Sequence, residues 1–259
     1  MMGPTNYFPT PNVFSGGWAD YFILAVIGIA LVLGMLLFVE RPKHEPNVHS
    51  PRMAWLRAGL YFCFVIVFSW ATGALQKVAY APIATKEQLG DPVWIGFTLL
   101  CFAVVAWGYL FWWPRGTLTH GRKLHLLASL GFGVAWGLSA GLFLLSVFAV
   151  LEEFQFPRLV TAVLLLLIVT VYNLNYQSGW WDIHVSPPHN IRAWNVRKVL
   201  FAHNPFLLVS LSYFFIYGNA WIYVVLNACA LGASAVAMRF PPFWAPDGGP
   251  VSPETAIGE

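Results

Sequence analysis

The chain has 259 residues, of which 58% are hydrophobic and only 10% are charged, with a formal net charge of +3. A soluble domain carries about 25% charged residues, so this composition excludes a water-soluble globular fold as well as disorder and a disulfide-stapled scaffold. It predicts an all-α, multi-pass protein of the cell membrane whose outer surface contacts the lipid bilayer. The basic residues are spread over the polar loops, so we expect no nucleic-acid partner.

Seven apolar segments are long enough to cross a bilayer, which takes about 20 helical residues. In chain order they are Trp18–Val39, Met53–Leu75, Val93–Trp113, Leu124–Leu151, Pro157–Tyr176, Val199–Tyr217 and Ala220–Met238. The turn signal Gly218-Asn219 alone divides the last two. We therefore expect a seven-helix transmembrane domain over residues 18–239, a short extracytoplasmic segment at 1–17 and a flexible cytoplasmic tail at 240–259.

Lys and Arg are unevenly divided between the two ends of these seven segments. The first, third and fifth loops share a side with the C-terminal tail, and this side carries eleven of the 14 basic residues. They are Arg41, Lys43, Arg52, Arg57, Arg115, Arg122, Lys123, Arg192, Arg197, Lys198 and Arg239. Because cytoplasmic loops carry an excess of Lys and Arg, we expect the N-terminus outside and the C-terminus in the cytoplasm.

The fourth apolar segment carries a small residue at every fourth position: Ser129, Gly133, Gly137 and Gly141. Positions four apart lie on one face of a helix. Small residues on one face let a second helix approach closely in a membrane. The spacing therefore predicts a helix-packing groove.

All seven histidines fall on the expected cytoplasmic side, and six of them form three pairs with the spacing H-x4-H. The pairs are His44 and His49, His120 and His125, and His184 and His189, while His203 lies at the start of the sixth segment. Neutral imidazole is a common ligand of iron and copper. The chain has no His-His doublet, so it does not match the histidine boxes of membrane desaturases and alkane hydroxylases.

The fifth loop is the most polar stretch of the chain. Polar residues at membrane depth are costly and indicate a functional site. From this loop and its neighbours we expect a transition-metal site, iron or copper, with ligands from Asp182, His184, His189, His203, His120 and His125. Asn175 and Asn190 would orient these ligands, and Trp180 and Trp181 would line an apolar substrate pocket. The alternative is a polar loop that caps helix ends and binds lipid headgroups.

These residues predict a membrane-embedded, metal-dependent oxidoreductase acting on a lipid, isoprenoid or hydrocarbon at the cytoplasmic mouth of the bundle. The competing interpretations are a non-catalytic accessory subunit, bound to other membrane subunits, and a small transporter. The last span contains no lysine, so a retinal Schiff base is not supported. A Gly-rich phosphate loop is also absent from the sequence.

Overall fold

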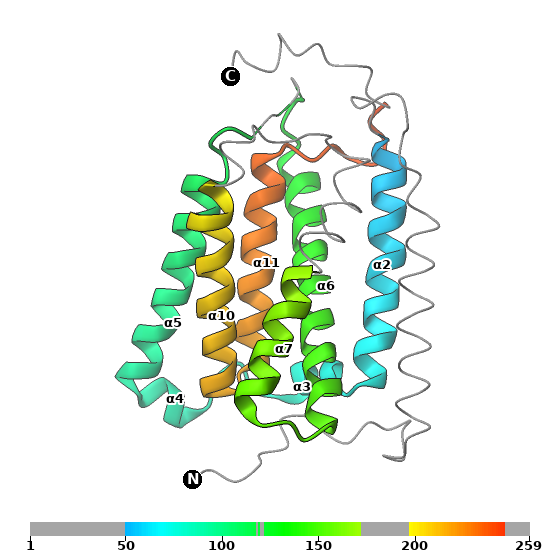
Figure 1. Ribbon diagram of the computed structural model, residues 1–259. Coiled ribbons are helices and arrows are strands. Elements are labelled where there is room, and N and C mark those ends of the chain that lie inside the picture. The colour runs from blue at the N-terminus through cyan, green and yellow to red at the C-terminus, as the bar shows by residue number, and fades with distance from the viewer. Residues whose placement is uncertain (1–49, 118, 120–121, 172–196, 247–259) are drawn as a thin grey trace.

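The computed structural model describes residues 50–117, 119, 122–171 and 197–246. In these ranges the chain forms helices joined by short turns, with no β-strand (Figure 1). Five helical stretches are long and apolar enough to cross a membrane: Ala54–Ala71, Pro92–Trp112, Leu126–Glu152, Val199–Tyr217 and Ala220–Ala237. The expectation of an all-helical, multi-pass membrane protein is confirmed at this level.

The helices have the following bounds. They are α2 (Pro51–Ala71), α3 (Ala74–Tyr80), α4 (Lys86–Gly90), α5 (Pro92–Val105), η1 (Ala106–Trp112), α6 (Leu126–Glu153), α7 (Arg158–Val171), η3 (Val199–His203), α10 (Asn204–Tyr217) and α11 (Ala220–Ala237). The expected first span, Trp18–Val39, lies outside the described residues. The expected fifth span is described only as α7, whose apolar stretch Arg158–Ile168 is shorter than a full span. The count of seven spans stays a prediction.

Two glycines set helix ends near the expected boundaries. The expected span Met53–Leu75 is wrong at its end, because α2 stops at Ala71 and Gly73 adopts a left-handed φ of 80° before α3 begins. Glycine adopts this conformation without the steric penalty of a side chain. The expected division between the last two spans is confirmed: Gly218 ends α10 with a φ of 62°, and the Asn219 side chain accepts a hydrogen bond from the Ile222 amide at 3.0 Å.

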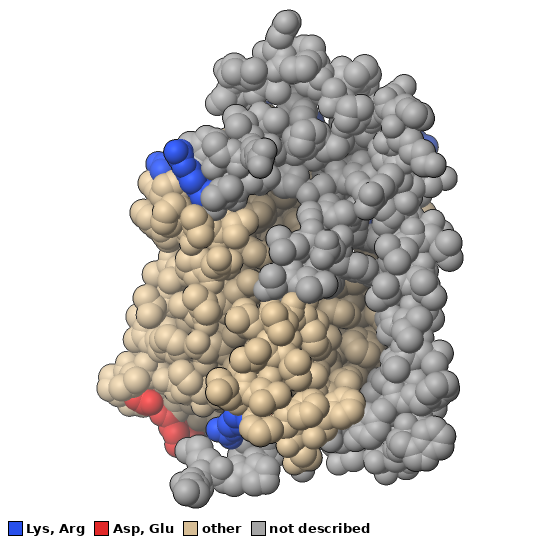
Figure 2. All heavy atoms as spheres, in the orientation of Figure 1, with Lys and Arg blue, Asp and Glu red and all other residues tan. Residues whose placement is uncertain are grey.

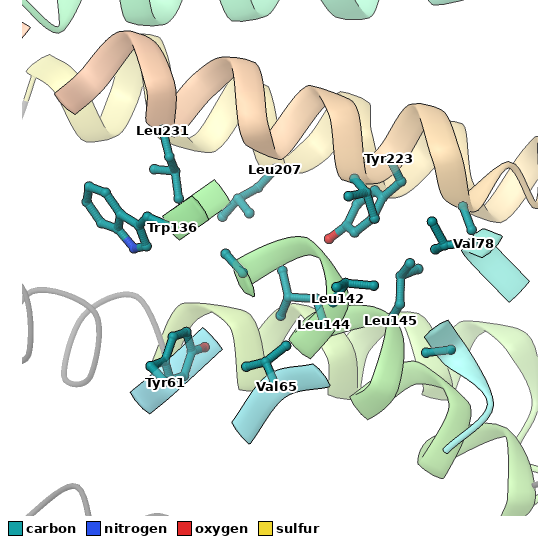
Figure 3. Close-up of a cluster of buried hydrophobic side chains, with 14 of the residues drawn as sticks. Tyr61, Val65, Val78, Trp136, Leu142, Leu144, Leu145, Leu207, Tyr223 and Leu231 are labelled. Atoms are coloured by element: carbon teal, nitrogen blue, oxygen red, sulfur yellow. The ribbon is translucent and has the colours of Figure 1, made fainter. Parts of the chain in front are cut away.

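Helix α6 lies at the centre of the bundle, with α2 on one side and α11 on the other (Figure 1). It runs parallel to α2, since Trp55 packs against Phe132 near the start of both helices and Ser146 donates to Ser69 near their ends. A cluster of buried side chains fills the space between these helices, with Val65 from α2, Leu145 from α6 and Tyr223 from α11 (Figure 3).

The close contact between α6 and α11 confirms the helix-packing groove that the sequence predicts. A Cβ atom on Gly133 would lie 2.5 Å from the Leu231 carbonyl oxygen. A Cβ on Gly137 would lie 2.4 Å from the Asn227 carbonyl oxygen, and one on Gly141 would lie 3.2 Å from Val224 Cα. The two backbones therefore touch along the whole row of glycines.

Helix α5 with η1 packs antiparallel against η3 with α10. At one end of this pair the Thr98 hydroxyl donates to the Tyr213 hydroxyl at 3.1 Å, and at the other end Tyr109 contacts His203. This pairing places the starts of α2, α6 and η3 and the ends of η1 and α11 at one end of the bundle (Figure 1).

We call this end the basic end, because its charged residues within the described ranges are all Lys or Arg. They are Arg52, Arg57, Arg115, Arg122, Lys123, Arg197, Lys198 and Arg239. The described acidic residues lie in or beside α4 and at the end of α6, which is the opposite end of the bundle: Glu87, Asp91, Glu152 and Glu153. On the face drawn in Figure 2, the acidic side chains of the described residues are seen only at that end. The excess of Lys and Arg at one end is the feature from which the N-terminus was predicted outside and the C-terminus in the cytoplasm. That orientation stays a prediction.

Candidate functional site at the basic end

Two π-helical segments face each other at the basic end. Segment η1 continues α5, and segment η3 leads into α10. The backbones meet at Gly108, where a Cβ atom would lie 2.8 Å from Ala202 Cα. A π-turn adds one residue to a helical turn and occurs frequently at functional sites. The paired π-segments are therefore the first feature of this end that indicates a function.

The residues that follow this contact, Tyr109 and His203, form a hydrogen bond. The Tyr109 hydroxyl lies 3.0 Å from His203 Nδ1. Tyr109 is completely buried, with its ring stacked on Trp113 at 5.3 Å and edge-on against Phe206 at 5.6 Å. His203 is only partly buried. The imidazole is therefore held through Nδ1, and Nε2 is the ring nitrogen that this bond leaves for another partner.

Lys198 lies one residue before η3 and is buried, with 1% of its surface exposed. Its amino group donates a hydrogen bond to the Thr117 hydroxyl and lies 5.5 Å from the centre of the Trp113 ring. Burial lowers the pKa of Lys198 to about 7. Trp113 thus contacts both Lys198 and Tyr109, and it packs the buried lysine beside the Tyr109–His203 pair.

Aromatic rings form the outer surface of the two π-segments. Trp112 stacks on Phe201 across the η1–η3 contact at 4.9 Å between ring centres. The Arg115 guanidinium lies 3.5 Å above the Phe111 ring. Phe111 and Phe201 are exposed, as expected for side chains that face lipid near the membrane surface.

A second group of basic residues fastens the segment before α6 to the end of α11. Arg122 donates to the Met238 carbonyl at 2.7 Å, and Arg239 donates to the Arg122 carbonyl at 2.9 Å. Burial and the nearby Arg239 lower the pKa of Arg122 to about 10. These contacts hold backbone groups together, so the group has a structural role.

Two of the six predicted metal ligands fall within the described residues. His203 lies in the π-segment pair, and His125 is an exposed residue that precedes α6. Across the described ranges, no group of three or more His, Cys, Asp or Glu side chains is close enough to hold a metal ion. The remaining predicted ligands and their neighbours lie outside those ranges: His120, Asp182, His184, His189, Asn175, Asn190, Trp180 and Trp181.

Tyr109, Lys198 and Thr117 were not predicted as site residues from the sequence. Tyr109 resembles any aromatic residue of an apolar span, and Lys198 was counted only as a basic loop residue. One signal could have pointed to Lys198: it directly precedes an apolar span and stands five residues before His203. No spacing in the sequence indicates that the chain forms the π-segments η1 and η3.

No protein-family model matches this sequence, and no curated protein or solved structure is significantly similar to it. The geometry of the described residues is therefore the basis of the functional proposal.

Proposed function

We propose that the chain is a membrane-embedded oxidoreductase that uses a histidine-bound iron or copper ion and acts on a hydrophobic substrate at the basic end. The observation that carries this proposal is the Tyr109–His203 contact at 3.0 Å between two π-segments. A metal-binding histidine almost always uses its second ring nitrogen in a hydrogen bond that fixes the ring. His203 has this arrangement, with Nδ1 fixed and Nε2 left for the ion.

The other ligands in this proposal come from two connections. The one between α7 and η3 contributes Asp182, His184 and His189, and the one before α6 contributes His120 and His125. Imidazole and carboxylate together form the ligand set of many iron sites, and imidazole also suits copper. Asn175 and Asn190 would orient the ligands, and the bound ion would supply redox chemistry.

A substrate dissolved in the lipid phase fits the surroundings of His203. Trp107, Phe111 and Phe201 are exposed on the same two π-segments and give them an apolar outer surface at the basic end. In the proposal, Trp180 and Trp181 complete this apolar surface as the pocket for the substrate. A hydrophobic molecule could then approach from the bilayer without passing through water.

Metal analysis of the purified full chain tests the proposal. We expect the parent protein to hold iron or copper, and His203→Ala and His189→Ala each to lose most of it, because an incomplete ligand shell binds metal far more weakly. His44→Ala is the matched control, since His44 lies in a proline-rich segment outside the predicted ligand set. A metal-free parent, or equal metal in all variants, would contradict the proposal and favour an accessory subunit of a membrane complex.

A further inference from the structure

Arg115 lies on a row of aromatic rings at the outer face of η1. Its guanidinium carbon is 3.5 Å from the centre of the Phe111 ring, and Phe111 stacks in turn on Trp107 at 4.7 Å. All three side chains are exposed. A guanidinium that stacks through its face keeps the N–H groups along its edge, and these groups bind phosphate in a fork of two hydrogen bonds. The row therefore combines an anion-binding group with an apolar surface.

Segment η3 carries a second row of the same kind beside the first. Arg197 is exposed and stands four positions before the exposed Phe201, so the two residues lie on one face of the helix. Trp112 joins the two rows, because its ring stacks on Phe201 at 4.9 Å and its centre lies 5.3 Å from the Arg115 guanidinium carbon. Each row runs from an arginine at the basic end to an aromatic ring deeper in the bundle.

An anionic phospholipid has the same order of charge and apolar surface as these rows. Its phosphate lies at the membrane surface, and its acyl chains lie below the phosphate. The charged residues that the structure describes at the basic end are all Lys or Arg, and Figure 2 shows uncharged described surface between such residues and the opposite end. Their excess predicts that this end meets the cytoplasmic leaflet, which carries the anionic lipids. The charge of the surface therefore complements an anionic headgroup.

We infer that the outer surface of η1 and η3 binds an anionic phospholipid, with Arg115 and Arg197 pairing with its headgroup phosphate and an acyl chain lying on Phe111 and Phe201. The lipid is a bound ligand, and its binding involves no metal and no redox step. The lipid site therefore goes beyond the proposed oxidoreductase and does not depend on it. Metal content tests the enzyme, and lipid affinity tests the site.

Native mass spectrometry of the full chain in detergent tests the site, with phosphatidylglycerol and phosphatidylcholine of the same acyl chains as the two probes. We expect phosphatidylglycerol to bind more tightly. One basic residue near a membrane surface raises the affinity for anionic lipid about 5-fold. Arg115→Gln and Arg197→Gln should therefore each lower the affinity for phosphatidylglycerol about 5-fold, and the double variant should lower it about 25-fold. The affinity for phosphatidylcholine should stay that of the parent.

Arg52→Gln is the matched control, because Arg52 is also exposed at the basic end but belongs to α2, which packs on α6. It should leave both lipid affinities unchanged. Equal affinity of the parent for the two lipids, or an equal loss in Arg52→Gln, would overturn the site, since only the overall positive charge would then attract lipid.

Glycerol 1-phosphate, which has the phosphate but no acyl chain, separates a lipid site from a site for a soluble phosphate compound. We expect it to leave the bound lipid in place at equal concentration, and displacement would overturn the lipid site. A parent chain that binds phosphatidylglycerol through Arg115 and Arg197 but contains no iron or copper would contradict the proposed oxidoreductase alone. A metal-containing chain without lipid preference would contradict the lipid site alone.

Discussion

Lys198 is the most deeply buried cationic side chain in the described part of the protein. Its amino group is removed from water, and contacts with the Thr117 hydroxyl and the face of the Trp113 ring replace part of the lost hydration. Such contacts recover less free energy than full hydration of an ammonium group provides. The neutral amine is therefore favoured, and the pKa of Lys198 falls from 10.5 to about 7.

This lowered pKa predicts a pH-dependent stability. Between pH 7 and pH 10.5 the unfolded chain binds a proton on Lys198 that the folded protein does not bind. The free energy of unfolding should therefore rise with pH in this window by up to about 1.4 kcal/mol per pH unit, and fall as the pH drops toward 7. Lys198→Met should remove this rise when thermal unfolding in detergent is measured at pH 7, 8 and 9.

Lys123→Met is the control for this measurement, because Lys123 lies at the same basic end but is exposed. It should keep the pH dependence of the parent protein. Equal slopes for the parent and Lys198→Met would show that the buried amine does not titrate in this range.

Single residues of the candidate site differ in how far the sequence could predict them. His203 was predicted because a histidine at the edge of an apolar span is uncommon and chemically distinctive. Tyr109 was not predicted, because its role depends on a partner 94 positions away along the chain. The burial of Lys198 was not predicted either, because hydropathy alone assigns a lysine at the end of a span to the neighbouring polar loop.

At the scale of whole elements, the contact between α6 and α11 shows what periodicity can predict. A small residue at every fourth position specified a groove on α6, and the glycines of this row lie against α11. The partner helix was not predicted, although α11 carries Ala228 and Gly232 four positions apart, and Gly137 and Gly133 of α6 lie against these two residues. The π-segments were also missed, because one additional residue in a turn leaves the hydropathy of a span unchanged.

Substitution of Gly137 should disrupt this contact. Its missing Cβ would meet the Asn227 carbonyl oxygen at 2.4 Å and Ala228 Cα at 2.5 Å, and backbone atoms cannot rotate away as a side chain can. Overpacking typically costs about 1–3 kcal/mol, and we expect Gly137→Leu to reach or exceed this range. The folded yield in detergent and the melting temperature should both fall.

Gly131 provides the matched control on the same helix. It is exposed, and a Cβ atom at this position would meet nothing within 4 Å. Gly131→Leu should therefore leave the yield and the melting temperature close to those of the parent protein. Normal behaviour of Gly137→Leu would mean that α6 and α11 are farther apart than the structure places them.

At the scale of the whole molecule, the segment after α11 joins three helices at the basic end. Phe240 is buried, with its ring stacked on Phe132 at 4.5 Å, and its carbonyl oxygen accepts from Ser129 of α6. The next carbonyl, of Pro241, accepts from the Trp55 indole of α2. The exit of the chain from the bundle is thereby fixed at the basic end, together with the starts of α2 and α6.

This arrangement gives the predicted orientation a test at two points of the chain. The basic end holds Lys and Arg and none of the described acidic residues, and such an excess marks the cytoplasmic side. A reporter fused after Glu259 should therefore be active only in the cytoplasm. An epitope inserted after Gln155, in the turn between α6 and α7, should be accessible only from the outside, because this turn lies at the opposite end of α6.

The two fusions control each other. The Gln155 turn follows the end of α6, and the C-terminal segment follows the end of α11, and these two helix ends lie at opposite ends of the bundle. Activity of the Glu259 reporter outside, together with a cytoplasmic Gln155 epitope, would invert the molecule and place His203 and Lys198 on the external side. The same side for both would instead contradict the antiparallel arrangement of α6 and α11. Only the predicted result places the candidate site in contact with cytoplasmic electron donors, as a reductase-coupled oxidation of a lipid-phase substrate would require.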